Sequence, residues 1–436
     1  MNARSSRMPH VFAIFVLMIA AVFLAAATVP AGTFAADAQT SLTKKQKAKK
    51  KAKKKARKKA KRLKRLRRGP AGLKFYKPTR PIPNQHGKLI WARNAGGVVP
   101  LENAKSTKLV LYSSRSIKGK KVAVSGSVSI PKGKAPRRGW PVVTYGHGTT
   151  GIADKCAPTR NTAGGPAEAY ISYTDNEMNE WLKRGYAVLR TDYEGLGTPG
   201  THPFLIGKAA GRGVLDIVRA AHDLNPRIGK RFLIAGHSQG GHASLFAAGI
   251  ADKWTPELKL RGTVAYAPAS YLKDQASLLP ALTTPSSLSA LATMIVRGAA
   301  SVSSAVDPSA LLSDPVLDFY PDVDTDCLAQ LAEPTSLGGI APSTLIRSGA
   351  DTTAFFDLLE QQNPVVASDA PILVAQGEND TTTFPFLTDR LATELDEVPG
   401  NKVIYSKYPG VDHGGIVDAA SDEVEAWFAK RLPSRR

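Results

Sequence analysis

An alternation between short apolar runs and helical patterns is the feature that most constrains the fold of this chain. The apolar runs cover residues 140–145, 187–190, 231–235, 262–266, 371–375 and 402–405. Helical patterns separate most of them, at 178–184, 211–224, 240–250, 385–395 and 416–431. Nearly continuous apolar strands that alternate with helices indicate an α/β architecture, with a mostly parallel central sheet flanked by helices. Period-2 stretches at 108–112 and 122–128 predict an antiparallel start to this sheet.

One long stretch breaks the alternation. Between residues 267 and 370 the chain is rich in Ser, Ala, Leu and Pro, with helical patterns at 286–296 and 353–361. We therefore predict a domain over 71–436 that carries an inserted helical cap at about 268–370. Its apolar surface, low in charge over 278–302, suits an apolar substrate or simply packing against the core.

The formal charge of +23 is concentrated near the N-terminus. Residues 44–68 hold 18 Lys or Arg and no acid, and the 368 residues that follow carry only about +4. The charge thus belongs to a Lys/Arg-rich low-complexity tail over 39–70, and it gives no ground for specific nucleic-acid recognition by the domain. The tail either binds anionic envelope polymers or lipids, or is a solvated linker.

The first residues have the pattern of an export signal. Arg4 and Arg7 precede an unbroken apolar run over 11–27, and small residues then offer cleavage sites near Ala35–Ala38. We expect a signal peptide over 1–38, and a secreted or cell-surface protein. An uncleaved membrane anchor is the alternative, because the run nearly reaches the length that spans a bilayer. The basic block that follows opposes translocation.

The strongest chemical motif is G-x-S-x-G, formed by Gly236, Ser238 and Gly240. It follows the apolar run 231–235 and precedes a helical pattern. A serine hydroxyl is a poor nucleophile, and it must be held on a sharp strand-to-helix turn where a base can reach it. Such a turn leaves little room, which explains the flanking glycines. The motif therefore predicts Ser238 as a nucleophile.

The partners of such a serine follow it in the chain, first an acid and then a histidine. Asp380 comes directly after the run 371–375, and His413 lies in a Gly-containing loop before the last helix. Histidine can take the serine proton near neutral pH, and the acid holds the imidazole in the correct tautomer. Glu378 and Asp412 are competing acids, although Asp412 is adjacent to His413 and poorly placed to face its ring.

The segment YGHGTTG at 145–151 ends another apolar run and predicts the oxyanion hole. In this arrangement the backbone N–H groups of Gln239, which follows the serine, and of a residue in this loop, most simply Thr149, bind the developing negative charge. His147 precedes the serine in an H-G loop motif, so we interpret it as structural.

The other histidines give no sign of a metal site. His237 and His242 flank the serine and are interpreted as packing or hydrogen-bonding residues, and the remaining ones have no metal-ligand spacing (His10, His86, His202 and His222). We expect no metal and no cofactor. The Gly-rich loop at 191–200 follows a strand and either shapes the substrate pocket or is structural.

The chain has two cysteines, Cys156 and Cys327. In an exported protein a lone pair is more often a disulfide than a metal site, and two unrelated buried thiols are the alternative.

Taken together, the motifs resemble those of the secretory lipase family of α/β-hydrolases, which includes a yeast lipase of type A. The resemblance rests on YGHGTTG at 145–151, TDYEGLG at 191–197, GHSQGG at 236–241, the Asp380 loop and DHGG at 412–415, and it spans roughly residues 75–432. It implies the α/β-hydrolase fold, a cap inserted after the sixth strand and hydrolysis of lipid esters. The basic tail departs from the family pattern.

The resemblance also implies roles for individual residues. It implies a triad of Ser238, Asp380 and His413, oxyanion residues Thr149 and Gln239, and a disulfide between Cys156 and Cys327. We predict a secreted carboxylic ester hydrolase, a lipase or esterase that acts on triacylglycerol-type lipids through an acyl-enzyme. The alternatives are a short-chain carboxylesterase, a serine peptidase or an acyltransferase of the same fold, and a non-catalytic surface-binding protein.

Overall fold

The computed structural model describes residues 47, 49–51, 53–54 and 68–434. The chain divides into two units, Met1–Leu63 and Lys64–Arg436, and each is treated by itself. In the first unit the described positions are helical. The predicted signal peptide, its cleavage site and most of the basic tail lie outside the described residues. No helix in the part of the chain that the structure describes is long and apolar enough to span a bilayer.

A nine-stranded sheet forms the centre of the second unit, in the order β1-β2-β3-β5-β4-β6-β7-β8-β9. Its strands are β1 (Leu89–Asn94), β2 (Ala104–Arg115), β3 (Lys121–Pro131), β4 (Trp140–Gly146), β5 (Ala187–Glu194), β6 (Ile228–His237), β7 (Lys259–Tyr266), β8 (Ile372–Gly377) and β9 (Val403–Tyr408). The pairs from β1 through β3 to β5 are antiparallel, and those from β5 to β9 are parallel. The predicted mostly parallel sheet with an antiparallel start is therefore confirmed.

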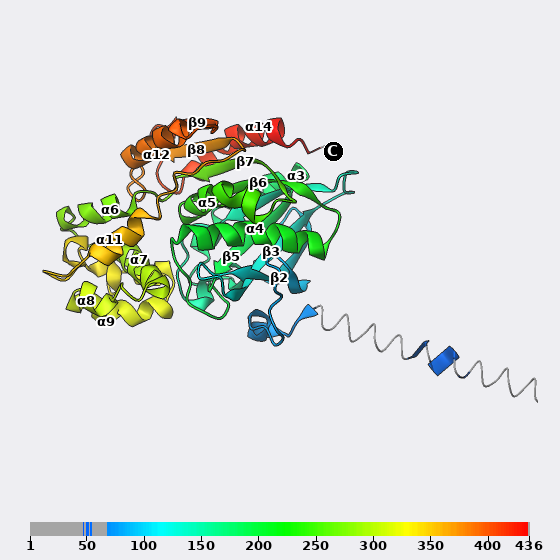
Figure 1. Ribbon diagram of the computed structural model, residues 1–436, viewed down its shortest axis with the longest axis horizontal. Helices are drawn as coiled ribbons and strands as arrows, with labels where there is room; N and C mark the ends of the chain where they lie inside the picture. The colour runs from blue at the N-terminus through cyan, green and yellow to red at the C-terminus, as the bar shows by residue number, and fades with distance from the viewer. Residues whose placement is uncertain (1–46, 48, 52, 55–67, 435–436) are drawn as a thin grey trace, which may run out of the picture. The chain divides into compact units, whose positions relative to one another are not determined.

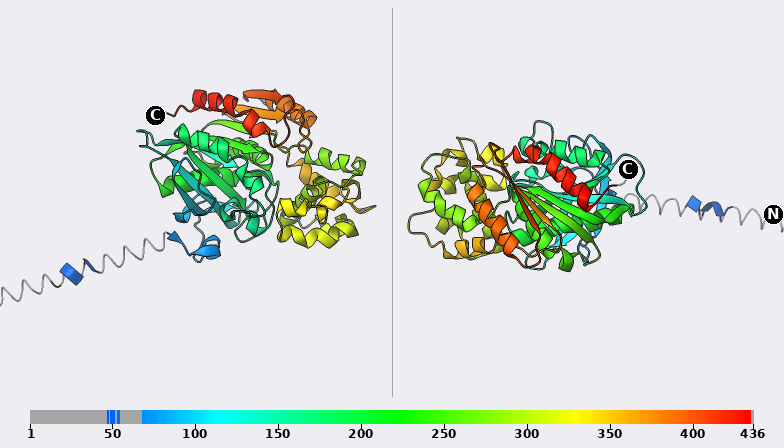
Figure 2. Two further views of the ribbon diagram at one scale, coloured as in Figure 1. Left: turned by 180° about the vertical axis from the view of Figure 1, so that it is seen from behind. Right: turned by 90° about the horizontal axis from the view of Figure 1, so that it is seen from above.

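Helices cover both faces of this sheet because neighbouring strand residues point to opposite sides. On one face Val142 and Phe232 pack with apolar residues of α4 (Gly207–Leu224) and α5 (Gln239–Trp254), which lie in front of the strands in Figure 1. The next residues along, Val143 and Leu233, pack on the other face, which is seen from behind in Figure 2. That face is covered by α3 (Asp175–Lys183), α13 (Ile416–Ala419) and α14 (Ser421–Arg431), while α12 (Pro385–Glu397) packs on β8 and β9.

The chain between β7 and β8 is helical and is called the helical segment (residues 268–370). Its helices are α6 (Leu272–Leu278), α7 (Leu288–Val302), α8 (Pro308–Leu311), α9 (Asp314–Phe319), α10 (Leu328–Leu331) and α11 (Thr353–Glu360). They group at one end of the sheet in Figure 1. They share a hydrophobic cluster of their own, in which Met294 and Phe355 are buried together with Phe204 and Leu205 from the loop before α4. The helical segment is therefore packed onto the α/β part through apolar contacts.

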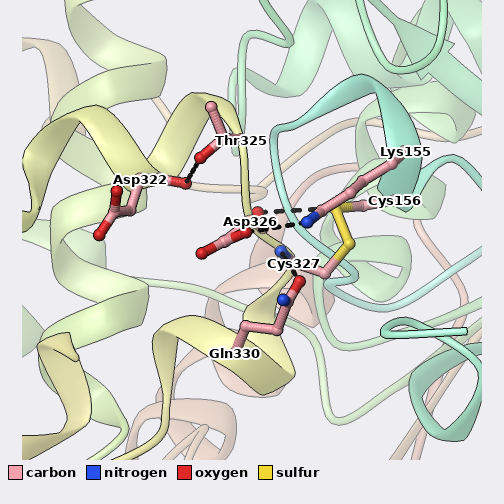
Figure 3. The surroundings of a disulfide bond; sticks show 7 residues. All are labelled: Lys155, Cys156, Asp322, Thr325, Asp326, Cys327 and Gln330. Atoms are coloured by element: carbon pink, nitrogen blue, oxygen red, sulfur yellow. Dashed lines mark hydrogen bonds and ion pairs between the residues drawn. A yellow bond between two sulfur atoms is a disulfide. The ribbon is translucent and has the colours of Figure 1, made fainter. Parts of the chain in front are cut away.

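A disulfide also joins the helical segment to the α/β part. Cys156, in the loop after β4, is bonded to Cys327 at the start of α10, and Figure 3 shows the surrounding polar contacts. Lys155 forms an ion pair with Asp326 at 2.8 Å beside it. The backbone N–H of Leu328 donates to the carbonyl of Thr150 at 3.0 Å. The disulfide expected from the family resemblance is present, and it fixes the helical segment directly beside the loop that holds Thr149.

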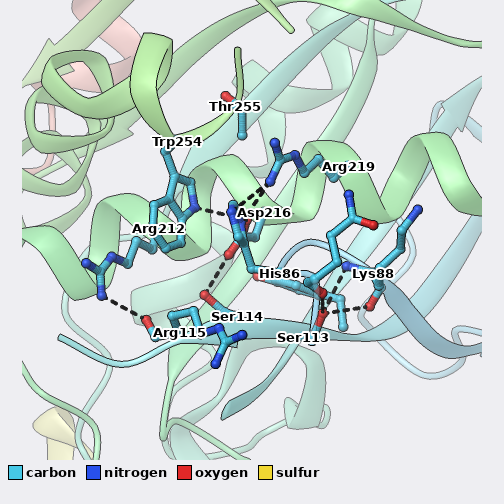
Figure 4. A network of polar contacts seen from close by, with 12 residues as sticks. His86, Lys88, Ser113, Ser114, Arg115, Arg212, Asp216, Arg219, Trp254 and Thr255 are labelled. Atoms are coloured by element: carbon cyan, nitrogen blue, oxygen red, sulfur yellow. Dashed lines mark hydrogen bonds and ion pairs between the residues drawn. The ribbon is translucent and has the colours of Figure 1, made fainter. Parts of the chain in front are cut away.

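Far from this end, a buried carboxylate ties the first strands to α4 (Figure 4). Asp216 on α4 accepts hydrogen bonds from His86 Nδ1 at 2.5 Å, Ser114 Oγ at 2.7 Å and Trp254 Nε1 at 3.0 Å. The His86 ring stacks on Trp254 with their centroids 3.9 Å apart. The donors to Asp216 come from the antiparallel end of the sheet and from α5, so this network explains how that end of the sheet is held to α4. We therefore interpret the network as structural.

The structure differs from the sequence expectation in a few elements. The helical pattern at 416–431 is split into α13 and α14, because Ser421 turns its hydroxyl toward the buried carboxylate of Glu177 at the break. Strand β1 and the short helix α2 (Ala169–Ser172) were not expected. Strand β1, LIWARN, has no clear period-2 alternation, and its pairing with β2 is what defines it.

Candidate active site

Ser238 occupies a strained turn between β6 and α5. Its backbone has φ 58° and ψ −118°, a left-handed conformation that is rare for a residue with a side chain. The surrounding chain holds this turn, because the Ser238 N–H donates to the carbonyl of Tyr266 and its own carbonyl accepts from Ala269 and His242. The turn is the strand-to-helix elbow that the G-x-S-x-G motif predicts, and it carries Ser238 at the carboxyl end of the sheet.

Close backbone packing explains the flanking glycines. A Cβ atom on Gly236 would lie 2.2 Å from the carbonyl oxygen of Gly240, and one on Gly240 would lie 1.9 Å from that of Gly146. Both distances are far below van der Waals contact, so no larger residue fits at either position. The same contact brings the end of β4, and with it the oxyanion loop, against the start of α5.

Asp380 lies in the loop after β8 and is buried. Its Oδ1 accepts the backbone N–H groups of Thr382 and Thr383, both at 2.8 Å. Its Oδ2 accepts from the Thr383 hydroxyl at 2.8 Å, from Gln376 Nε2 at 3.0 Å and from His413 Nδ1 at 2.7 Å. Burial alone raises the pKa of this carboxyl, but the hydrogen bond and charge of His413 and the bonds from Thr383 outweigh it and lower the pKa to about 2. Asp380 is therefore a fixed carboxylate.

The two competing acids are placed elsewhere. Glu378 is exposed and lies 3.8 Å from Lys407. Asp412 is also exposed, and its carboxylate accepts the backbone N–H of Gly415 within its own loop. Of the three candidate acids, Asp380 is the one whose carboxylate is hydrogen-bonded to the ring of His413.

His413 lies between Asp380 and the pocket that contains Ser238. Its Nδ1–H donates to Asp380, which leaves Nε2 with its lone pair on the opposite side of the ring. His413 and Ser238 line the same pocket, but within residues 68–434 no hydrogen bond joins them. Catalytic hydrogen bonds are often long or poorly aligned in structures without substrate.

Thr149 and Gln239 are the two residues predicted to bind the oxyanion formed at Ser238. Both residues line an apolar pocket together with Ser238. Neither of their backbone N–H groups donates a hydrogen bond to any residue within 68–434. Gln239 begins α5, where the first backbone N–H groups of a helix lack intrahelical partners. These two N–H groups are the free donors that an oxyanion hole requires.

His202 is a site residue that sequence reasoning did not assign. The side-chain Nε2 of Gln239 donates to His202 Nε2 at 2.9 Å, and His202 Nδ1 donates to the carbonyl of Glu194 at 2.8 Å. Burial lowers the pKa of His202 to about 4, so the ring is neutral and can accept. His202 thereby holds the Gln239 side chain. No local motif marks it, because its partner lies 37 residues away.

His147 and His242 also lie near the serine, and each has a ring nitrogen within hydrogen-bond distance of a backbone carbonyl. His147 is buried, with Nδ1 2.6 Å from the carbonyl of Gly148 and its ring against Tyr193, and burial lowers its pKa to about 3. His242 Nε2 donates to the carbonyl of Gln362 at 2.9 Å, and burial lowers its pKa to about 4. Neither ring contacts His413 or Asp380 by a hydrogen bond within the described chain.

A buried carboxylate near the end of β5 holds the strand just before the Gly-rich loop. Asp192 is buried and accepts from Ser125 Oγ at 2.6 Å, from the backbone N–H of Thr159 at 3.1 Å and from the Thr159 hydroxyl. Burial raises its pKa to about 6 despite these bonds. Its acceptors are all used by the scaffold, so its role is structural.

A deep apolar pocket extends from Ser238 into the helical segment. It encloses about 940 Å³, counting its open mouth. Aliphatic and aromatic side chains form most of its wall, notably those of Leu205, Leu272, Leu291, Ala292, Ile295, Leu345, Phe355 and Phe384. No Asp, Glu, Lys or Arg lines it within the described residues. An apolar chain attached to a group held at Ser238 is the ligand that such walls accommodate.

A second, more polar pocket opens on the other side of Ser238. His413, His237 and Tyr173 line it, together with Tyr170 and Asp418 at positions open to solvent. The two pockets share Thr149, Ser238, Leu291 and Thr382. A ligand whose reacting atom sits at Ser238 can therefore extend in two directions. Within the described part of the chain no group of three His, Cys, Asp or Glu could hold a metal ion.

Comparison with known proteins places these features in a family context. Residues 168–300 match the secretory lipase family. Lipase 6 of Candida albicans is 28% identical over 203 residues, which cover 44% of this chain and 40% of the relative. The match thus spans less than half of that relative's length. These two matches confirm the similarity to the secretory lipase family that the motifs predict.

Solved structures confirm the fold. Lipase A of Candida antarctica in its closed state superposes with a TM-score of 0.65 at 18% identity, covering 80% of this chain and 84% of the other. A rice cell wall degrading esterase from Xanthomonas oryzae superposes with a TM-score of 0.64 at 17% identity, covering 80% of this chain and 100% of the other. The described domain therefore has the α/β-hydrolase fold.

Proposed function

We propose that this chain, which is similar to the secretory lipases, is a serine hydrolase that cleaves carboxylic esters with long apolar acyl groups. The observation that carries the proposal is the position of Ser238. It sits on a strained elbow at the mouth of an apolar pocket, with the His413–Asp380 pair on the other side and two free N–H donors beside it. That constellation suits acyl transfer.

The proposed reaction proceeds in two steps. His413 Nε2 takes the proton of Ser238 as the hydroxyl oxygen attacks the ester carbonyl. The N–H groups of Thr149 and Gln239 stabilise the oxyanion, and the alcohol leaves with the proton from His413. Water then gives a proton to His413 as it attacks the acyl-enzyme, and His413 returns that proton to the Ser238 oxygen as the acid leaves. Asp380 stays ionised throughout, because it orients the ring and stabilises the imidazolium.

The shape of the site supports long acyl chains over short ones. The pocket that runs into the helical segment has apolar walls and no charged side chain among the described residues, and it begins at Ser238. We propose that the acyl chain enters this pocket and that the alcohol occupies the second pocket, which is lined by His413 and Tyr173. The helical segment acts in this scheme as a cap that forms the acyl site. Triacylglycerol-type lipids are the proposed substrate class.

Export is also part of the proposal. Similarity to secretory lipases and the pattern of the first 38 residues support a secreted protein, and a disulfide suits an oxidising compartment. The basic segment 44–68 would then hold the enzyme on anionic envelope polymers or lipids. Deleting 44–68 is expected to weaken such binding in a salt-dependent way and to leave turnover of a soluble ester unchanged.

The function is tested with p-nitrophenyl esters of increasing acyl length. We expect turnover that rises with chain length in the wild type and vanishes in Ser238→Ala. Ser244→Ala is the matched control, because Ser244 is also buried on α5 but its hydroxyl bonds only the carbonyl of Gly240. Turnover confined to short esters would instead identify a short-chain carboxylesterase. No turnover of any ester would favour a non-catalytic surface-binding protein.

A further inference from the structure

We propose that Tyr173 and His237 form a positioning pair that holds the His413 loop against the oxyanion loop, so that the base and the oxyanion hole keep a common alignment. His237 lies beside the nucleophile in sequence, and Tyr173 follows α2. Neither is assigned a part in the proposed chemistry. The inference rests on the proposed function, because it concerns the same base.

The backbone of His413 has a single anchor in the described chain. His237 Nε2 lies 2.7 Å from the carbonyl oxygen of His413. No other hydrogen bond within residues 68–434 involves the backbone of His413. Gly414 and Gly415 follow it directly, and a Cβ atom on Gly414 would meet nothing within 4 Å. Because Asp380 bonds the ring and His237 bonds the backbone, the His237 bond is one of two that decide where the ring is presented.

The hydrogen-bonding pattern fixes the protonation of His237. A carbonyl can only accept, so Nε2 of His237 carries the hydrogen that it donates to His413. Its Nδ1 then has a lone pair and accepts from the hydroxyl of Tyr173, at 2.5 Å. Burial, with the nearby charge of His413, lowers the pKa of His237 to about 3, so the ring stays neutral at ordinary pH. Tyr173 therefore selects the tautomer that holds the loop.

The same pair touches the oxyanion loop. A Cβ atom on Gly148 would lie 2.8 Å from the Tyr173 hydroxyl and 3.4 Å from His237 Nδ1. Gly148 precedes Thr149, so the pair packs directly against the residue before the proposed oxyanion donor. On the other side, the ring of His237 lies against the ring of His413, with centroids 4.6 Å apart. The Tyr173–His237 pair thus contacts both the ring of His413 and the loop that holds Thr149, and neither side chain takes part in the proposed bond changes.

The expected consequence is a loss in turnover without a loss in binding. Proton transfer depends on the position of His413 Nε2 to within a fraction of an ångström, and a shift of about 1 Å can cost as much as 100-fold in rate. Tyr173 and His237 line the pocket proposed for the alcohol, but neither lines the apolar pocket that is proposed to bind the long acyl chain. Removing the anchor is therefore expected to lower kcat and leave KM for a long-chain ester nearly unchanged.

The test compares two substitutions at one position in the full chain. His237→Leu removes both hydrogen bonds, and we expect kcat for a long-chain p-nitrophenyl ester to fall roughly tenfold or more. His237→Gln can still donate from the end of its side chain to the carbonyl of His413, and we expect it to recover most of the lost kcat. Tyr173→Phe keeps the ring and removes only the hydroxyl, so a smaller fall in kcat is expected.

A matched control separates positioning from general destabilisation. His242 is also buried and also donates through Nε2 to a backbone carbonyl, but that carbonyl belongs to Gln362. His242→Leu is expected to lower Tm about as much as His237→Leu while kcat stays near the wild-type value. Equal kcat in His237→Leu and wild type, no recovery in His237→Gln, or a change confined to KM would each overturn the inference alone. A wild-type chain that turns over no ester would overturn the proposed function as well.

Discussion

Asp380 and His413 lie in the loops after two neighbouring strands, with Oδ2 of the carboxylate 2.7 Å from Nδ1 of the ring. Five donor groups surround that carboxylate, counting His413 Nδ1 and both groups of Thr383. The bond therefore joins a fixed acceptor to the ring of a residue whose own backbone makes one hydrogen bond in the described chain. His413 is thus held from two sides, because Asp380 bonds its ring and His237 bonds its backbone carbonyl.

Replacing Asp380 by Asn is expected to lower kcat by roughly 10³- to 10⁴-fold, because an amide that presents its N–H to Nδ1 favours the wrong tautomer of His413. Initial rates with a p-nitrophenyl ester measure this. Glu378→Gln, in the same loop but exposed, is the control and is expected to be nearly silent. A similar loss in both variants would contradict the assignment of Asp380.

The same carboxylate predicts an acid limit to stability. The pKa of Asp380 is about 2 in the folded chain, below the value of about 3.9 for an unfolded aspartate. Its contribution is thus fully present above pH 4 and is lost as the pH falls through 2. Chemical unfolding of wild type and Asp380→Asn at several pH values should show a steeper acid loss in the wild type. Parallel pH profiles would argue against a depressed pKa.

Glu177 predicts a pH dependence of opposite sign. Burial raises its pKa to about 7, although hydrogen bonds from Ser421 and Tyr266 oppose the shift. Because this value lies above that of about 4.3 for an unfolded glutamate, the neutral form stabilises the fold in acid, and this stability is lost as the pH rises through 7. Glu177→Gln should flatten the fall of Tm between pH 5 and 8 by several degrees. Glu180→Gln, on the solvent side of the same helix, is the control, and an equal effect there would contradict the prediction.

Gly240 and Gly96 form a matched pair for testing the elbow. A Cβ atom on Gly240 would overlap the carbonyl of Gly146, whereas one on Gly96 would meet nothing within 4 Å. We expect Gly240→Ala to cost roughly 1–3 kcal/mol of unfolding free energy and most of the activity, because the oxyanion loop must move away. Gly96→Ala should change neither. Denaturant unfolding and ester turnover measure both effects, and a fully active Gly240→Ala would show that the packing is softer than the distances indicate.

The sequence reveals the parts of this site that depend on local chain geometry. The elbow at Ser238 can be predicted because its glycines, strand and helix are adjacent, and Asp380 and His413 because each follows a strand of the predicted sheet. His237 holds the carbonyl of a residue 176 positions later, a contact that no local period or spacing encodes.

The same limit applies to the fold. Strands β4 to β9 have the continuous apolar character of buried parallel strands, whereas β1 is defined by its pairing with β2. The break between α13 and α14 depends on a tertiary hydrogen bond from Ser421 to Glu177. A helical period continues through that break, so the sequence predicts one helix where packing makes two.

The disulfide is expected to stabilise the domain and to keep the oxyanion loop in place. Its cysteines are 171 residues apart, and closing a loop of that length is worth about 5 kcal/mol in the chain-entropy model, with measured values commonly lower. Replacing both Cys156 and Cys327 by Ser should lower Tm and raise the rate of thermal inactivation. Lys155→Ala, which removes only the neighbouring ion pair, is the control. Equal Tm in the double variant and wild type would contradict this role.

The wall of the apolar pocket gives the most direct test of acyl specificity. Ala292 lies on α7 and lines the pocket beside Leu291 and Ile295. In Ala292→Phe the added ring should occupy the space that a long acyl chain needs, while Ser238 and its partners stay in place. We expect kcat/KM for long-chain p-nitrophenyl esters to fall at least tenfold, because the ring blocks the part of the pocket that would enclose the long acyl chain. The kcat/KM for the acetate ester should change little, because acetate does not reach that part of the pocket. Equal losses for acetate and long-chain esters would mean that the variant disturbs the elbow. An unchanged preference would mean that the acyl chain lies in the second pocket beside His413, and it would reverse the proposed orientation of the substrate.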